Sequence, residues 1–479
     1  MTASSRSWVR WVRPSITTWL WLTLVVVLST EPWRVAMVSA DGDTCMHWAC
    51  GEWMLTHRQL LNRDVFSYTH AGQPIISKEW LAQLLFALAA RWDGLAGIAL
   101  LAAVVLATTF ALLHAQLLRD RNELVVTTGL TVLAVWASVT HWIARPHLFT
   151  LLCLVLWNST LRREPSWRWY AGLPALMALW VNLHGGFLAG FITLGCYWVG
   201  ALWERDWRRW RACTVVGVLG VIASLLNPSG YRLHWHNLQF VRNQFFTDWL
   251  AEYASADFHN PAHAGFLLLL LAVWGAIALA PHRCRPTDVI LTLVWGYFAL
   301  YSVRNIPLFA IIVTPIIAPA WSAFLPVAWH ERTTRWVWLR DARAGWLLAI
   351  AGLAWLVTGV DRTTEMPADK FPVRAVEYIR THPEQFNGRM FNQYIWGGYL
   401  LIALPEHPVF IDGRADFFGE EHVRTFDRVT DLQPGWTEPL EKYEVRWTLM
   451  PPDHRLNAAL ALAGWQKIYE DKTAVIYRR

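Results

Sequence analysis

The sequence carries little charge for its length, since Asp, Glu, Lys and Arg make up 16% of its 479 residues. It also lacks a CxxC pair, and of its six cysteines only Cys45 and Cys50 lie in a segment expected to face water. At their spacing on a helix, these two are poorly placed for a disulfide. A Walker phosphate loop, a GxSxG nucleophile elbow and an HExxH zinc motif are absent as well. These absences exclude the common soluble nucleotide, serine-hydrolase and zinc-protease chemistries.

Hydrophobic residues make up 55% of the chain, and they occur in long runs rather than in alternation. A bilayer core of about 30 Å needs about 20 apolar residues per helix, so the runs predict an α-helical polytopic membrane protein with about 11 transmembrane helices. Because the run at 80–117 is too long for one span, we expect residues 79–92 to form an interfacial or re-entrant helix that leads into the crossing. The expected spans are 16–30, part of 80–117, 124–142, 146–161, 168–184, 186–203, 212–227, 263–280, 286–302, 304–324 and 343–360.

Arginines cluster in alternate short segments between these spans, and many of the 33 tryptophans flank the same segments. Lys and Arg in short loops stay cytoplasmic, and indole rings favour the headgroup layer. With the N-terminus cytoplasmic, every arginine cluster falls inside, which predicts a multi-pass protein of the inner (cytoplasmic) membrane. The net charge of +6 is then a topology signal, and we expect no nucleic-acid partner. Residues 38–40 would suit signal-peptidase cleavage, but we expect the first span to be retained because further spans follow it.

The same topology divides the chain into two domains. Residues 1–360 form the transmembrane domain, with a large first outer loop (31–79) and a second long outer loop (228–262). Residues 361–479 form a small soluble α/β C-terminal domain on the outer face. The polar, Gly- and Pro-containing segments of the bundle fall on that face too.

Short patterns predict the elements of the C-terminal domain. Residues 372–381 place their apolar side chains on one helical face. The segments 409–411 and 474–477 are short apolar runs bounded by turn residues, which predicts two buried strands.

Two acids, Asp41 and Asp43, stand directly after the first expected span, separated by one glycine. Carboxylates this close at a membrane surface can hold a divalent cation or take a proton from an acceptor hydroxyl, so both are candidate catalytic residues. The alternative is a helix N-cap with solvated acids. Spacing alone favours that alternative, whereas the position at the start of a large outer loop favours function.

An acidic motif after the first span, amphipathic helical pieces, a bundle of spans and a soluble outer domain resemble glycosyltransferases of the C-type (GT-C) fold. These include protein O-mannosyltransferases and the catalytic subunits of oligosaccharyltransferases. Asp41 with the later segment 64–68 (DVFSY) is similar to the oligosaccharyltransferase arrangement. The resemblance implies a donor sugar on a polyprenyl phosphate and an acidic loop residue that acts on the acceptor. The sequence lacks the Asp-Glu pair of the first family and the WWDYG motif of the second, and the second absence argues against glycosylation of Asn sequons.

Cationic and imidazole side chains gather at the outer ends of the expected spans. Charged groups near membrane depth usually have a partner or a function, and guanidinium forks suit phosphate. We therefore expect these side chains to bind the donor phosphate, whose negative charge grows as the sugar leaves. The alternative for any one of them is interfacial snorkelling. The candidates are Arg304, Arg145, His147, His184 and Arg232.

The second long outer loop contains two further acids, Glu252 and Asp257. The resemblance to oligosaccharyltransferases implies that a late outer-loop Glu completes a cation site with Asp41 and Asp43. The cation would be Mg²⁺ or Mn²⁺. Alternatively, both are loop acids that face water, which is the simpler interpretation.

Two motifs of the C-terminal domain, residues 391–400 and 409–418, combine aromatic, amide and acidic side chains. They are similar in position to the acceptor side of oligosaccharyltransferase outer domains, and aromatic faces beside Asn and Asp suit sugar or peptide contacts. We therefore expect acceptor binding there, although the glycines of these motifs can also simply permit tight turns. The candidates are Asn392, Tyr394, Trp396, Asp412 and Arg414.

Taken together, these patterns predict a membrane enzyme that moves a sugar from a polyprenyl-phosphate carrier to a glycan, lipid or protein acceptor at the outer face. We expect an inverting single displacement in which Asp41, assisted by Asp43, deprotonates the acceptor while Arg304 or Arg145 stabilises the departing phosphate. Two alternatives remain. A transporter or flippase of lipid-linked glycans would place its charges near the midplane, and a non-catalytic scaffold would leave Asp41 and Asp43 in bulk water.

Overall fold

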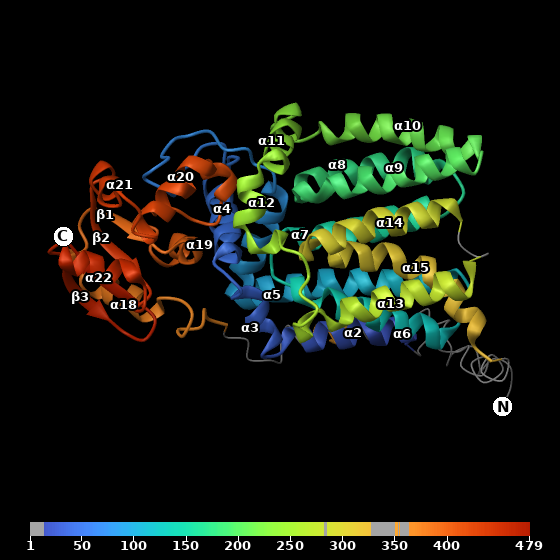
Figure 1. Ribbon diagram of the computed structural model, residues 1–479, viewed down its shortest axis with the longest axis horizontal. Helices are drawn as coiled ribbons and strands as arrows, with labels where there is room; N and C mark the ends of the chain where they lie inside the picture. Colours follow the sequence, from blue (N-terminus) through green and yellow to red (C-terminus); the bar gives the residue numbers. More distant parts are fainter. Residues whose placement is uncertain (1–13, 282–284, 327–349, 353, 355–363) are drawn as a thin grey trace.

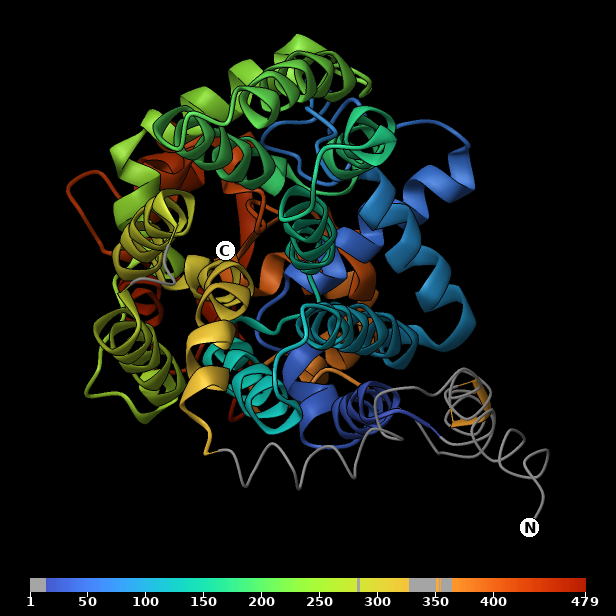
Figure 2. The same cartoon turned by 90° about the vertical axis from the view of Figure 1, so that its right-hand side faces the viewer.

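The computed structural model describes residues 14–281, 285–326, 350–352, 354 and 364–479. Figure 1 shows a bundle of long helices with the C-terminal domain covering one end, which we call the domain end. The opposite end of the bundle lies on the right-hand side of this view. Seen from that opposite end, the helices are viewed almost along their axes (Figure 2). The expected span 343–360 falls almost wholly outside the described residues, so the number of crossings stays a prediction.

Every expected span between residues 16 and 324 is helical. Within the described part of the chain, five helical segments are long and apolar enough to cross a membrane: Trp80–Arg119, Leu124–His141, Gly185–Trp203, Pro261–Leu279 and Val303–Phe324. The helices of the bundle are α2 (Ile16–Ser29), α5 (Trp80–Arg119), α6 (Leu124–Ser138), α7 (His147–Leu161), α8 (Leu173–Leu183), α9 (Leu188–Trp203), α10 (Trp207–Ser224), α13 (Ala264–Leu279), α14 (Pro286–Tyr301) and α15 (Ile306–Phe324).

The outside of the bundle is apolar. Leu271 and Trp274 on α13 and Leu293 and Tyr297 on α14 are all more than half exposed. Large apolar faces of this kind are unusual on soluble proteins and suit contact with lipid. The exposed faces therefore support a multi-pass membrane protein.

Helix α5 is two helices joined at a sharp break. Asp93 and Gly94 have non-helical backbone angles, and Gly94 has a positive φ of 53°. The turn is so tight that a Cβ on Gly97 would collide with the carbonyl oxygen of Ala89. The expected division of this segment into a short leading helix and a crossing is thus present, and the interfacial position of the leading helix stays a prediction.

The two long connections at the domain end are more regular than loops. The first contains α3 (Trp33–Val38) and α4 (Asp43–His57), followed by an irregular segment to residue 79. The second, which the sequence analysis treated as a loop, is mostly helical because its aromatic side chains pack onto the C-terminal domain. Its elements are α11 (Tyr231–Arg242), α12 (Gln244–Trp249), η4 (Ala251–Tyr253) and η5 (Pro261–His263).

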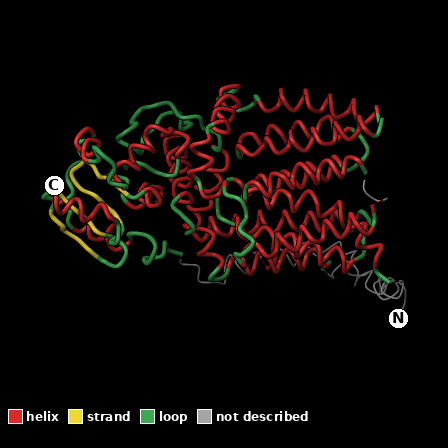
Figure 3. Tube along the Cα trace, in the orientation of Figure 1, coloured by secondary structure: helices red, strands yellow, loops and turns green. Residues whose placement is uncertain are grey.

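The C-terminal domain is α/β, and the named strands lie within it (Figure 3). Its sheet has the order β1-β2-β4-β3, in which β1 pairs parallel with β2 and the other two pairs are antiparallel. The strands are β1 (Arg389–Asn392), β2 (Val445–Met450), β3 (Gln466–Glu470) and β4 (Val475–Arg478). The helices are α18 (Val373–Thr381), α19 (Tyr394–Ala403), α20 (Ala415–Thr430), α21 (Thr437–Lys442) and α22 (Arg455–Leu462).

Two of the three elements expected here are present, namely α18 and β4. The prediction of a strand at 409–411 is wrong. This buried segment makes one isolated bridge, from Val409 to Ser67, and is not part of the four-stranded sheet. The residue it pairs with belongs to the first long connection. The segment therefore serves as a junction between the two domains.

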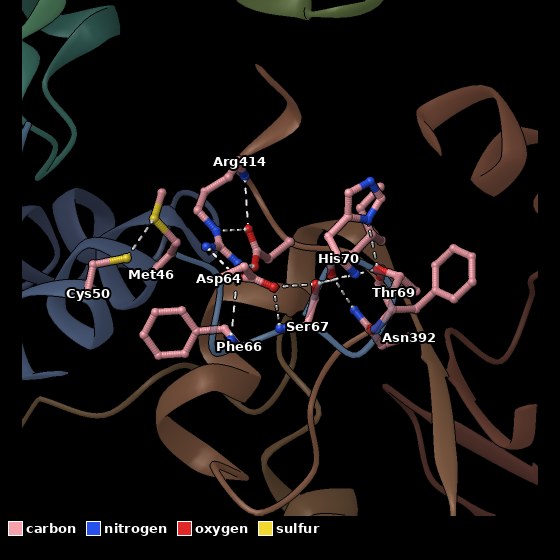
Figure 4. Close-up of polar contacts among 12 residues, drawn as sticks. Met46, Cys50, Asp64, Phe66, Ser67, Thr69, His70, Asn392 and Arg414 are labelled. Carbon is pink, nitrogen blue, oxygen red and sulfur yellow. Dashed lines mark hydrogen bonds and ion pairs between the residues drawn. The ribbon is translucent and has the colours of Figure 1, made fainter. Parts of the chain in front are cut away.

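A buried ionic junction fixes the first long connection to the C-terminal domain (Figure 4). Arg414 pairs with Asp412 at 2.6 Å and with Asp64 at 2.9 Å. The Asp64 carboxylate also accepts hydrogen bonds from the backbone N–H and the hydroxyl of Ser67, at 3.0 and 2.6 Å. The Arg414 guanidinium lies over the ring of Phe66 at 5.3 Å. Charges buried this well are stable only when paired and hydrogen-bonded, so the junction holds both domains in one arrangement.

Candidate functional site

The acidic motif lies where α4 meets α19. The Asp41 carboxylate accepts a hydrogen bond from the N–H of Asp43 at 3.0 Å, and Gly42 is the N-cap of α4. A Cβ on Gly398 of α19 would collide with the carbonyl oxygen of Gly42. The small residues thus let the backbone of α19 touch the acidic turn, which fixes the turn against the C-terminal domain.

Gly413 approaches the same turn from the loop before α20. A Cβ at this position would collide with Oδ1 of Asp43. Glycine is the residue that permits a backbone to come this close to a side chain. Two glycines of the C-terminal motifs therefore position the acids.

Arg145 joins the two acids. Its Nη2 contacts the carboxylate of Asp41 and lies 3.0 Å from Oδ2 of Asp43. The segment that carries it is tied to the first long connection, since the N–H of Ala144 donates to the carbonyl of Met37 at 2.7 Å. One guanidinium from the bundle thus binds both acids of the motif.

Glu252 links this arginine to a second one. Its Oε1 accepts a hydrogen bond from Nη1 of Arg304 at 3.0 Å, and its Oε2 lies 3.7 Å from Nη1 of Arg145. Arg304 lies in η7 (Val303–Asn305), which precedes α15, and its guanidinium stacks on the ring of Tyr253 at 4.6 Å. The result is a chain of alternating charges across the domain end of the bundle.

A fourth carboxylate, Glu79, lies between two imidazoles. It is 3.5 Å from Nε2 of His184 and 3.8 Å from Nδ1 of His47. Nδ1 of His184 accepts a hydrogen bond from the N–H of Gly186 at 3.0 Å, so in the neutral ring the proton is on Nε2 and faces Glu79. This orientation aims His184 into the polar cluster.

A second ionic group, beside Glu79, fixes α20 to the two long connections. Lys78 pairs with Asp416 at 2.7 Å, and Asp416 also contacts Nε2 of His236 at 2.8 Å. Burial opposes ionisation of Asp416, yet these two partners hold its pKa well below the usual value. The anion is therefore a firm link between the second long connection and the C-terminal domain.

Burial and crowding of acids dominate the electrostatics of the cluster. Burial, then the negative charge of Glu252, raise the pKa of Asp43 well above its usual value. Burial also raises the pKa of Glu79. For Glu252, burial acts in the same direction, but Arg304 and Arg145 outweigh it and lower the pKa. Glu252 is thus the firm anion, whereas burial favours the protonated forms of Asp43 and Glu79.

Three of the expected phosphate-binding residues lie in this cluster, namely Arg145, Arg304 and His184. His147 lies beside it, with its ring 6.4 Å from that of His184 and Nε2 bonded to the carbonyl of His141 at 2.9 Å. Arg232 is exposed on α11 and makes no ion pair among the described residues. It lies apart because helical periodicity turns it to the outer surface of α11.

Four of the five expected acceptor residues are buried inside the C-terminal domain: Asn392, Trp396, Asp412 and Arg414. Their polar groups are used within the protein. Asn392, for example, donates to the carbonyl of Ile411 and accepts from the N–H of Phe410, both at 2.9 Å. Their surroundings indicate a positioning role, which revises the expectation of direct contact.

Tyr394 differs from these four because it is only partly buried and lies near the acidic turn. Burial and the negative charge of Asp43 raise its pKa well above the usual value. Its ring packs on Trp249 of α12, with a centroid distance of 4.9 Å. Acceptor contact stays a prediction for this residue.

The carboxylates do not fit a divalent cation in this arrangement. Asp41, Asp43 and Glu252 converge on the guanidinium of Arg145, which takes the space between them. Asp257 lies apart, with a side chain 66% exposed and 3.4 Å from His259. Among the described residues, no group of three or more His, Cys, Asp and Glu side chains is arranged to hold a metal ion.

Glu79 and Lys78 end the first long connection and were not among the predicted site residues. Both stand directly before a long apolar run, which is the same signal that marked Asp41 after the first span.

Solved structures with the same fold exist at low sequence identity. ArnT from Cupriavidus metallidurans, bound to undecaprenyl phosphate, is 16% identical with a TM-score of 0.57 over 96% of this chain and 97% of that chain. AglB, the oligosaccharyltransferase of Archaeoglobus fulgidus, in complex with an inhibitory peptide and a dolichol-phosphate, is 12% identical with a TM-score of 0.59 over 90% and 68%. The apo form of the A. fulgidus oligosaccharyltransferase is 12% identical, with a TM-score of 0.58 over 91% of this chain and 69% of that chain.

The similarity is one of fold. No family profile and no curated protein sequence matches this chain. The chain is distantly similar to glycosyltransferases of the GT-C fold, and it aligns with nearly the whole of ArnT.

Proposed function

We propose that this protein is a GT-C glycosyltransferase that moves a sugar from a polyprenyl-phosphate carrier to an acceptor at the outer face of a membrane. The observation that carries the proposal is the pairing of Asp41 and Asp43 with Arg145 at one end of an apolar bundle. The proposal is supported by two structures of the same fold that hold undecaprenyl phosphate and dolichol-phosphate.

The reaction is a single displacement. Asp41, oriented by its hydrogen bond to the N–H of Asp43 and by Arg145, takes the proton of the acceptor hydroxyl as its oxygen bonds to the anomeric carbon. The bond from that carbon to the phosphate oxygen breaks, and its electron pair leaves with the polyprenyl phosphate. Attack opposite the leaving group inverts the anomeric centre.

Arg304 and Arg145 supply the positive charge for the departing phosphate. Guanidinium groups placed in advance where charge develops favour the transition state over the ground state. Their side chains are 25% and 20% exposed, so a ligand can reach both. No step of this mechanism needs a metal ion.

The acceptor would approach from the C-terminal domain. Tyr394, at the start of α19, is close enough to Asp43 for that charge to raise its pKa, and it offers an aromatic face and a hydroxyl. Such a group suits a sugar or a polar lipid headgroup. The two alternative functions have less support, since the charges gather at one end of the bundle and Asp41 and Asp43 are only 26% and 20% exposed.

Donor turnover in liposomes tests the proposal. The purified protein would receive a panel of labelled sugars on undecaprenyl and dolichyl phosphate, and free polyprenyl phosphate and labelled product would be measured. We expect turnover with one or more donors and a loss of at least about 100-fold in Arg304→Ala. Arg232→Ala, which removes an exposed arginine outside the cluster, is the matched control and should keep its rate. Equal rates in wild type and Arg304→Ala would contradict the proposed role.

A further inference from the structure

The carboxylate of Glu252 lies where an anion would be bound by two arginines. Its two oxygens face different guanidinium groups, Arg304 at 3.0 Å and Arg145 at 3.7 Å. These arginines come from separate segments of the bundle, one before α15 and one before α7. A carboxylate and a phosphate present similar pairs of oxygens to a guanidinium fork.

We propose that Glu252 occupies the position of the donor phosphate until the donor binds, and that the phosphate of the incoming lipid displaces it. This inference rests on the proposed function and gives Glu252 a role opposite to that of a metal ligand. The side chain competes with the substrate, and its removal strengthens substrate binding.

Charge balance explains why displacement is required. The charges of the two guanidinium groups are already balanced by the carboxylates of Glu252 and Asp41. An added phosphate would meet uncompensated negative charge as long as Glu252 remained between the arginines. Once the Glu252 side chain has turned away, both arginines have a free face for the phosphate.

The surroundings of Glu252 allow this movement without unfolding of the loop. Its backbone carbonyl accepts a hydrogen bond from the hydroxyl of Ser302 at 2.9 Å, and the N–H of Val303 donates to the carbonyl of Ala254 at 2.9 Å. The Glu252 side chain is 27% exposed, so it can rotate into water. Arg304 keeps its stacking contact with Tyr253 when the carboxylate leaves.

Phosphate binding to the full chain in neutral detergent tests the inference. The probe is ³²P-labelled geranyl phosphate, a water-soluble prenyl monophosphate, and equilibrium dialysis measures its affinity. We expect Glu252→Gln to bind the probe about tenfold more tightly than wild type, because one opposing unit charge is removed. Glu252→Asp keeps the charge and should bind like wild type or slightly better. Asp257→Asn, which removes an exposed charge from the same loop, should lie within about twofold of wild type.

The outcomes separate this inference from the function on which it rests. If Arg304→Ala abolishes binding but Glu252→Gln binds as weakly as wild type or more weakly, the competitor role is wrong and the phosphate site stands. If wild type, Glu252→Gln and Arg304→Ala all bind equally or not at all, both ideas fail. Geraniol, which has no phosphate, should be bound equally by all variants. Tighter geraniol binding by Glu252→Gln would mean that the substitution opens an apolar site, and it would overturn the charge argument.

Discussion

Arg145 and Asp43 lie 3.0 Å apart, although one belongs to the bundle and the other to the first turn of α4. The same nitrogen contacts Asp41. This relationship makes the arginine the common partner of both candidate catalytic acids. It also connects the transmembrane helices to the segment that the C-terminal domain holds in place.

Replacing Arg145 should reduce sugar transfer more strongly than it reduces the stability of the protein. In Arg145→Gln, the two acids and Glu252 would repel one another with no cation between them. We expect loss of sugar transfer and a free energy of unfolding lower by about 1–3 kcal/mol, since the group is partly exposed. Thermal denaturation and transfer assays measure the two effects. Arg145→Lys should restore stability better than activity, because an ammonium cannot bind two carboxylates as a planar fork does. Full activity in Arg145→Gln would contradict the assignment.

The pH dependence of transfer should report the ionisation of Asp43. Burial and nearby acids raise its pKa, so the active ionised pair forms only above the usual carboxylate range, and the rate should rise with pH there. Glu252 is the acid that contributes most to this shift. Its replacement in Glu252→Gln removes a negative charge, favours the ionised form of Asp43 and should move the acidic limb of kcat/KM to lower pH. Asp257→Asn serves as the control and should leave the limb unmoved.

The free energy of unfolding should also depend on the ionisation of Asp43. It should fall as the pH rises, whereas the rate of transfer should rise. A carboxyl whose folded pKa lies above its unfolded value favours folding below the unfolded pKa. That contribution is lost as the pH rises through the folded pKa. Asp43→Asn should therefore gain stability relative to wild type between pH 4 and neutral pH, as measured by thermal denaturation. A constant difference between the two proteins at all pH values would show that the environment of Asp43 is not as described.

Gly413 offers a test of how closely the C-terminal domain positions the acids. A Cβ at this position would collide with Oδ1 of Asp43, so Gly413→Ala should displace the carboxylate and lower kcat by about tenfold or more. The matched control is Gly195→Ala on α9, where an added Cβ meets no atom within 4 Å. Unchanged kcat in Gly413→Ala would mean that the contact has no functional role.

Removal of divalent cations should have little effect on transfer. Arg145 takes the space between the three carboxylates that a metal ion would need. We expect rates in excess EDTA within about twofold of those in Mg²⁺ or Mn²⁺. A loss of transfer that returns on addition of either ion would show that the cation displaces Arg145 and completes the site.

The helices of the bundle were predictable because their signal is local. Long apolar runs specify helices by length and composition alone, and the Gly- and Pro-containing breaks between them end the helices near the expected residues. The gathering of Asp41, Arg145, Glu252 and Arg304 at one end also followed from the sequence, because alternate connections of a helical bundle lie at the same end.

The roles of the C-terminal motifs were not predictable in the same way. Asn392, Asp412 and Arg414 have the composition of a binding surface, but contacts with Asp64, Ile411 and Phe410 bury them. These partners come from another connection or from tertiary pairing, which a pattern in one segment does not reveal. The helices α11 and α12 were missed for a related reason, since packing onto the C-terminal domain stabilises them.

Sugar transfer by Asp41→Asn tests the central claim most directly. The variant and wild type, matched for expression and folding, would be supplied with labelled polyprenyl-phosphate sugars, and Asp257→Asn would control for the loss of a charge. We predict that Asp41→Asn keeps its fold and its binding of geranyl phosphate but loses transfer by at least about 100-fold, since the base is missing. Transfer equal to wild type in the folded variant would contradict the account.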